Sequence, residues 1–202
     1  MKHFFNFTAV VIITIMMIGC TKSNGYVVTG KDTTGRCPNG EWAYLCIQKD
    51  NPEDFHYIDS VKIENNGFRF EGKIENPTIA HIMTRAYNDS LRFNKPIIVH
   101  DFILESGNIE TDCQDDMHTP SGTPLNDKIT SFYTEIATLL ESLEEEDLSE
   151  EEIINKAFEF TKNKIKENAD NEFGVFVAEL MYGEFSPKQH LEMFNLLSNK
   201  QE

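Results

Sequence analysis

The hydrophobic pattern of this chain changes its period once, near Thr123, and this change limits the folds available to it. Before Thr123, short runs of β-branched and aromatic residues alternate with Gly, Pro, Asn and Asp, which is typical of strands and turns. After it, apolar residues recur at steps of three and four, which is typical of helices. We therefore expect an α+β protein with an all-β domain at 26–122 and a helical region at 123–202.

About seven strands are predicted in the first part. The runs with the length and composition of strands are 26–29, 41–48, 56–63, 67–74, 78–85, 96–104 and 108–113. Because no helical segment separates these runs, we expect an antiparallel β-sandwich or a partly open barrel.

The strongest hairpin signal is Asn66-Gly67, between the third and fourth runs. A type I′ turn needs positive φ angles at its two central residues, and Asn and Gly tolerate them best. Phe68 and Phe70 then share one face of the next strand and charged residues the other, so one face is expected to be buried.

About four helices are expected after the strands, arranged as a bundle. Thr123 is the predicted N-cap of the first, with Pro124 at the first helical position. Ser149 and Glu152 have the spacing of a capping box and should open the second helix.

A third helix is expected at 173–182, closed by Gly183. A fourth should open at Ser186-Pro187. Its predicted core face consists of Leu191, Phe194, Leu196 and Leu197.

Residues 1–19 have the pattern of a secretory signal: an apolar run from Phe4 to Ile18 ends in Gly19-Cys20. The run is shorter than the about 20 residues that cross a bilayer. A small residue before a cysteine resembles a bacterial lipoprotein signal, in which the thiol receives a diacylglycerol. We expect lipidation of Cys20; a plain signal peptide or an anchor helix is the alternative.

Residues 20–25 form a short polar tether. No acidic cluster follows Cys20 directly, so we expect the protein to be anchored in the cell envelope and to face the periplasm. Acyl chains would supply the membrane attachment.

The net charge of −16 repels phosphate backbones and anionic headgroups, which argues against nucleic acid and against electrostatic docking to membranes. Much of the acidity lies at 141–152. A calcium loop would need a glycine for its turn, and this run has none, so we expect a solvated junction between two helices.

Three cysteines remain besides Cys20, and none belongs to a C-x-x-C pair. Cys37 and Cys46 flank a predicted turn, so about 17 Å of chain would separate them, more than a disulfide spans. We expect Cys46 to be a core residue. Cys37 and Cys113 remain as candidate reactive thiols.

The remaining polar residues form no recognised catalytic or metal motif. His81 and His100 lie within predicted strands, and Asp116 with His118 lacks the spacing of a metal site. We therefore expect neither a cofactor nor a metal.

Asp101 and Glu105 would lie on one face of a strand, but about 13 Å apart, too far for an acid–base pair. Ser106-Gly107 and Ser121-Gly122 are better explained as turns than as nucleophile elbows.

Three ordered segments carry a family resemblance: 58–61 leading to 66–72, then 102–109, then 121–126. Together they resemble the domain-of-unknown-function family 4369, over about 26–126. In Bacteroidetes this domain commonly precedes a thioredoxin-like domain in secreted thiol:disulfide oxidoreductases and peroxiredoxin-like proteins. The helices that follow here look like the linker helices of those proteins.

The resemblance does not bring redox activity with it, because the chain reaches Glu202 without a thioredoxin-like C-x-x-C. We expect a lipid-anchored, non-catalytic binding or accessory module that faces an envelope protein or an unidentified ligand. The alternative is an accessory of a separate thioredoxin-like oxidoreductase system, acting through Cys37 or Cys113. A hydrolase is a weaker third hypothesis.

Overall fold

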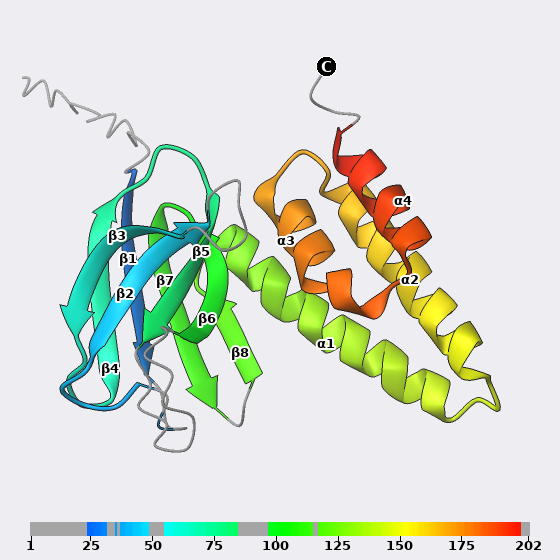
Figure 1. Ribbon diagram of the computed structural model, residues 1–202, viewed down its shortest axis with the longest axis horizontal. Helices are drawn as coiled ribbons and strands as arrows, with labels where there is room; N and C mark the ends of the chain where they lie inside the picture. Colours follow the sequence, from blue (N-terminus) through cyan, green and yellow to red (C-terminus); the bar gives the residue numbers. More distant parts are fainter. Residues whose placement is uncertain are drawn as a thin grey trace, which may run out of the picture.

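A computed structural model describes residues 24–31, 35, 37–48, 55–84, 97–114 and 117–198 of the 202-residue chain. In this part, eight strands form two four-stranded sheets, and four α-helices follow them (Figure 1). The predicted α+β class is confirmed, and the two sheets form a sandwich without closing into a barrel.

The first sheet contains, in order, β4 (Gly67–Lys73), β1 (Gly25–Lys31), β7 (Gly107–Gln114) and β8 (Met117–Ser121). β1 runs antiparallel to β4 but parallel to β7. The expectation of purely antiparallel strands is wrong for this pair. β1 and β7 are distant in the chain, so no hairpin turn forces them to run antiparallel. Side chains alternate between the two faces of a strand in either direction, so parallel pairing still buries the same apolar face.

The second sheet contains, in order, β3 (Phe55–Lys62), β2 (Trp42–Gln48), β5 (Thr78–Thr84) and β6 (Ile97–Leu104), all antiparallel. Apolar side chains of both sheets meet in one buried core. Its large, fully buried members include Phe70, Ile109, Leu45, Ile82 and Phe102.

β8 is a strand that the sequence pattern does not predict. It is five residues long and contains Pro120, which has no N–H to donate to a sheet. Proline is tolerated where a strand lies at a sheet edge, and β8 is the edge strand beside β7.

The predicted hairpin exists, but its turn lies one residue earlier than expected. Asn65 and Asn66 have φ angles of 52° and 58°, whereas Gly67 already belongs to β4. Two backbone hydrogen bonds between Glu64 and Gly67 close the turn. Asparagine tolerates the left-handed region well enough to fill both central positions.

The helices are α1 (Pro124–Glu144), α2 (Glu150–Glu167), α3 (Glu172–Leu180) and α4 (Pro187–Ser198). The capping box of Ser149 and Glu152 is confirmed. Thr123 occupies the predicted N-cap position of α1, yet its side chain caps no backbone N–H. Its hydroxyl instead accepts a hydrogen bond from Asn126 Nδ2 at 2.7 Å.

Two details of the last helices differ from the prediction. α3 ends at Leu180, and Tyr182–Glu184 form a short 3-10 helix, so Gly183 lies within that turn rather than closing α3. In α4 the fully buried side chain is Met193, whereas Leu191 is 63% and Phe194 43% exposed. The packing against α2 and α3 decides which face of this short helix is covered.

Residues 145–149 join α1 to α2, and residues 145–147 of the acidic run are exposed there. This agrees with the expected solvated junction. Lys156 and Glu146 form an ion pair across it, with Nζ and Oε2 2.9 Å apart.

The helical region attaches to the sandwich through the first turn of α1. The Asn126 side chain accepts a hydrogen bond from Ile103 N at 2.9 Å and donates one to Ile103 O at 2.7 Å. It thereby pairs with the outer edge of β6, whose other edge pairs with β5. Ile103 itself packs into the helical core with Ile129 and Phe132.

Candidate functional site

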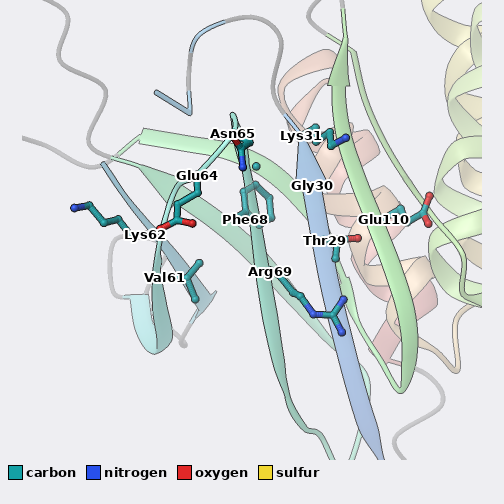
Figure 2. A pocket seen from close by; sticks show the side chains of 11 residues that line it. Thr29, Gly30, Lys31, Val61, Lys62, Glu64, Asn65, Phe68, Arg69 and Glu110 are labelled. Carbon is teal, nitrogen blue, oxygen red and sulfur yellow. The ribbon is translucent and has the colours of Figure 1, made fainter. Parts of the chain in front are cut away.

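A cavity of about 650 Å³ opens at the end of the sandwich where β1, β4 and the β3–β4 turn meet (Figure 2). In Figure 2, Val61, Lys62 and Glu64 form one wall, and Thr29 to Lys31 of β1 lie opposite, with Phe68 between them. The lining residues are Thr29, Gly30, Lys31, Val61, Lys62, Glu64, Asn65, Gly67, Phe68, Arg69 and Glu110.

Gly30 allows the close packing at the base of this cavity. A Cβ atom there would lie 2.3 Å from the Thr111 carbonyl oxygen and 2.5 Å from Cζ of Phe68. A glycine within a strand often marks a close approach of this kind. The buried Phe68 ring also contacts Phe70 and His100, with ring centroids 5.7 and 5.6 Å away.

The cavity presents charges of both signs at its mouth. Lys62 and Glu64 are exposed, and the Arg69 guanidinium forms an ion pair with Glu71 at 2.6 Å. The eleven described lining residues include no histidine, cysteine or serine. An aromatic base below paired charges suits the binding of a polar molecule that has an apolar part.

A second polar group lies where the sandwich meets the helices. His81 of β5 faces Asp101 of β6 in the strand register, and His81 Nδ1 lies 2.6 Å from Asp101 Oδ1. The Phe55 ring packs edge-on to the imidazole, with centroids 5.4 Å apart. His81 Nε2 is buried and has no hydrogen-bond partner among the described residues.

Two further titratable groups surround this pair. Burial, followed by the charge of Asp101, raises the pKa of Tyr133 to about 12. Partial burial of its carboxyl group raises the pKa of Glu179, although the side chain is exposed overall. The His81 charge lowers that pKa, whereas Glu172 and Asp101 raise it. The group therefore couples β5 and β6 electrostatically to α1 and α3.

Asp101 and Glu105 have separate partners. Asp101 pairs with His81, and Glu105 Oε1 accepts a hydrogen bond from Leu125 N at 2.7 Å. Glu105 therefore caps the N-terminus of α1 from across the chain, where a carboxylate is favourable. In the described structure, Glu105 fixes the start of α1 against the end of β6.

Cys37 and Cys46, the two cysteines whose side chains the structure describes, are buried. Cys46 is a core residue as predicted, and burial raises the pKa of its thiol to about 12, which keeps it protonated at neutral pH. Cys37 is buried in the sandwich core. The side chain of Cys113 and the whole of Cys20 lie outside the described part.

No three His, Cys, Asp or Glu side chains converge as metal ligands within the described residues. Asp116 and the side chain of His118 are not among them. In the same part of the chain, none of the helices combines the length and hydropathy that crossing a bilayer requires.

The sequence interpretation missed the cavity. Gly30 follows the predicted run 26–29, and only the structure extends β1 over it, where a glycine marks a close backbone approach. The His81–Asp101 pair had no such signal, because the cross-strand register of β5 and β6 brings it together.

Comparison with known proteins identifies the β part. No curated protein matches the chain. The model of the family described as "Domain of unknown function (DUF4369)" matches residues 26–129, a little over half of the 202 residues. This span includes the sandwich from the second residue of β1 onward and the first turn of α1, which anchors the helices. The chain therefore belongs to the DUF4369 family.

Proposed function

We propose that this protein is a lipid-anchored, non-catalytic binding module of the cell envelope that faces the periplasm. The observation that carries the proposal is the cavity in Figure 2, whose aromatic base and paired charges suit recognition of a ligand or of a partner's side chain. Elsewhere in the β part, the His81–Asp101 pair joins β5 to β6, and Glu105 accepts a hydrogen bond from the first turn of α1.

The proposed anchor is compatible with the position of the cavity. β1 begins five residues after Cys20, so the sandwich would stay close to the lipid. The cavity uses Thr29 to Lys31, at the far end of β1, about 20 Å along the strand from Gly25. A site there would open away from the membrane.

Family membership favours a second candidate, an accessory of a separate thioredoxin-like thiol:disulfide oxidoreductase. The burial of Cys37 and Cys46 supports contact through the protein surface rather than thiol exchange by these two residues. Insulin reduction by the full chain, with Cys37→Ser and Cys113→Ser variants as controls, tests for redox activity. Turnover that both substitutions abolish would overturn the non-catalytic proposal.

The binding role is tested by photo-crosslinking in the native envelope, with a crosslinker at Asn65. We expect one adduct that the Lys62→Ala/Glu64→Ala double variant loses. Lys73→Ala/Glu75→Ala is the matched control, because it removes the same two exposed residue types from the other end of β4. Equal adducts in all three proteins would refute a role for the cavity.

The anchor is tested separately with labelled palmitate. Label should enter the wild type and be absent from Cys20→Ala. Equal labelling of both proteins would contradict lipidation at Cys20.

A further inference from the structure

A groove of about 640 Å³ lies between the N-terminal halves of α2 and α4, in the helical region and separate from the cavity of Figure 2. Five carboxylates and one lysine line it; they are Glu150, Glu151, Glu159, Glu184, Glu192 and Lys188. The groove is therefore strongly acidic.

Two apolar side chains, Ile154 and Phe158, lie among the polar residues that line this groove. Phe158 is buried, whereas Ile154 is 38% exposed and offers the accessible apolar surface. Gln189 and Asn155 reach across from α4 to α2, with Nε2 and Oδ1 3.5 Å apart. Carboxylates around an exposed isoleucine complement a segment that carries both cations and apolar side chains.

Besides Lys188, a second lysine of the chain, Lys162, contacts residues that line this groove. The Lys162 ammonium lies 5.0 Å from the centre of the Phe158 ring. It forms an ion pair with Glu159 and lies 3.8 Å from Glu192. An aromatic face flanked by carboxylates is a favourable setting for an ammonium group, and the other carboxylates extend this chemistry along the groove.

We propose that the groove between α2 and α4 docks a basic, amphipathic peptide segment of a partner protein. The proposal rests on the binding role above and specifies the class of partner. A metal ion fits less well, because the described carboxylates do not converge. A second copy also fits less well, because a chain of net charge −16 repels itself.

The probe is a synthetic peptide in which lysines alternate with leucines and which carries one fluorescein label at its end, so that Trp42 does not contribute to the signal. Its fluorescence anisotropy is titrated with the full chain in neutral detergent. We expect saturable binding that weakens as NaCl rises past about 0.15 M, where the screening length falls to about 8 Å. A lysine–serine peptide of equal charge should bind several-fold more weakly.

Glu151→Gln/Glu184→Gln should raise the peptide Kd about fivefold, the size expected when two exposed charge pairs are lost. Ile154→Ser should weaken binding to a similar extent by removing the exposed apolar side chain of the groove. The matched control is Glu75→Gln/Glu167→Gln, which removes two exposed carboxylates remote from the groove. The control should bind like the wild type, and circular dichroism checks that each variant is folded.

Each of four outcomes would overturn the groove proposal. They are no saturable binding, equal weakening by the control variant, equal binding of the lysine–serine peptide, and a dimer that the Glu151/Glu184 variant dissolves. Lost peptide binding with an intact Asn65 crosslink would refute the groove alone. A lost crosslink with intact peptide binding would refute the cavity alone.

Discussion

The sandwich and the helical region are stabilised by contacts of different range. In the sandwich, the cavity base brings Gly30 of β1 against Thr111 of β7, residues far apart in the chain. In the helical region, capping boxes such as Ser149 with Glu152 join residues three positions apart. A single substitution should therefore affect the sandwich as a whole but a helix only locally.

The protein carries a separate spectroscopic reporter for each region. Trp42, the single tryptophan, lies on β2, so its fluorescence follows the sandwich. Far-ultraviolet circular dichroism at the helical minimum follows α1 to α4. Urea denaturation monitored by both signals measures how each substitution affects each region.

The largest effect is expected for Gly30→Val. The new Cβ would overlap the backbone of β7 and the Phe68 ring, and overpacking of this kind costs about 3 kcal/mol or more. The Trp42 transition should move to much lower urea. Gly183→Ala is the control, because no atom lies within 4 Å of its added Cβ; a similar loss there would contradict the packing argument.

Asn126→Ala should cost about 2–3 kcal/mol, because it leaves the buried backbone groups of Ile103 without their partner. These two hydrogen bonds connect the helical region to the sandwich. Without them the regions should unfold at different urea concentrations, so the fluorescence and dichroism transitions should separate. Asn163→Ala, at an exposed position of α2, is the matched control. Coincident transitions in Asn126→Ala would mean that other contacts hold the regions together.

Ser149→Ala should cost about 1 kcal/mol by removing the cap of α2. The loss should be seen mainly in the dichroism transition. An equal shift in Trp42 fluorescence would contradict the local character of helix stabilisation.

The smallest effects concern pH. Hydrogen bonds from the Ser149 backbone and side chain lower the pKa of Glu152 in the folded state. Its stabilising contribution is present above the unfolded pKa and is lost as pH falls through the folded pKa. Glu152→Gln should therefore be less stable than the wild type at pH 7, and the difference should shrink below about pH 4.

Glu179 should show the opposite sign, because burial raises its pKa. Its contribution is present below the unfolded pKa and is lost as pH rises through the folded pKa. Glu179→Gln should gain stability relative to the wild type at neutral pH and lose that gain in acid. Denaturation of both variants across pH measures the two trends, and equal trends would contradict this assignment.

The sequence interpretation succeeded where the signal is local. The change of period near Thr123 predicted the order of strands and helices, and Ser149 with Glu152 predicted the start of α2. The sequence interpretation failed where contacts with other parts of the fold decide which residues are buried or where a turn lies. The exposed face of α4 is one example, and the one-residue shift of the turn to Asn65 and Asn66 is another.

The candidate site follows the same division. The residues that line the cavity lie in or beside strands that the sequence pattern predicted. They form one cavity only because β1 lies between β4 and β7 in the sheet, and the pattern does not predict this order. The groove between α2 and α4 likewise requires two helices that are separated in the chain to pack together. Neither the order of strands nor the pairing of helices leaves a repeating signal in the chain.

By itself, the sequence determined the α+β class, the capping box of α2 and most element bounds, because backbone geometry within a few residues controls them. The tertiary structure alone decided the parallel pairing of β1 with β7, the His81–Asp101 contact and the attachment of Asn126 to β6. These contacts join distant segments, and their partners are chosen by packing and by the need to satisfy buried polar groups.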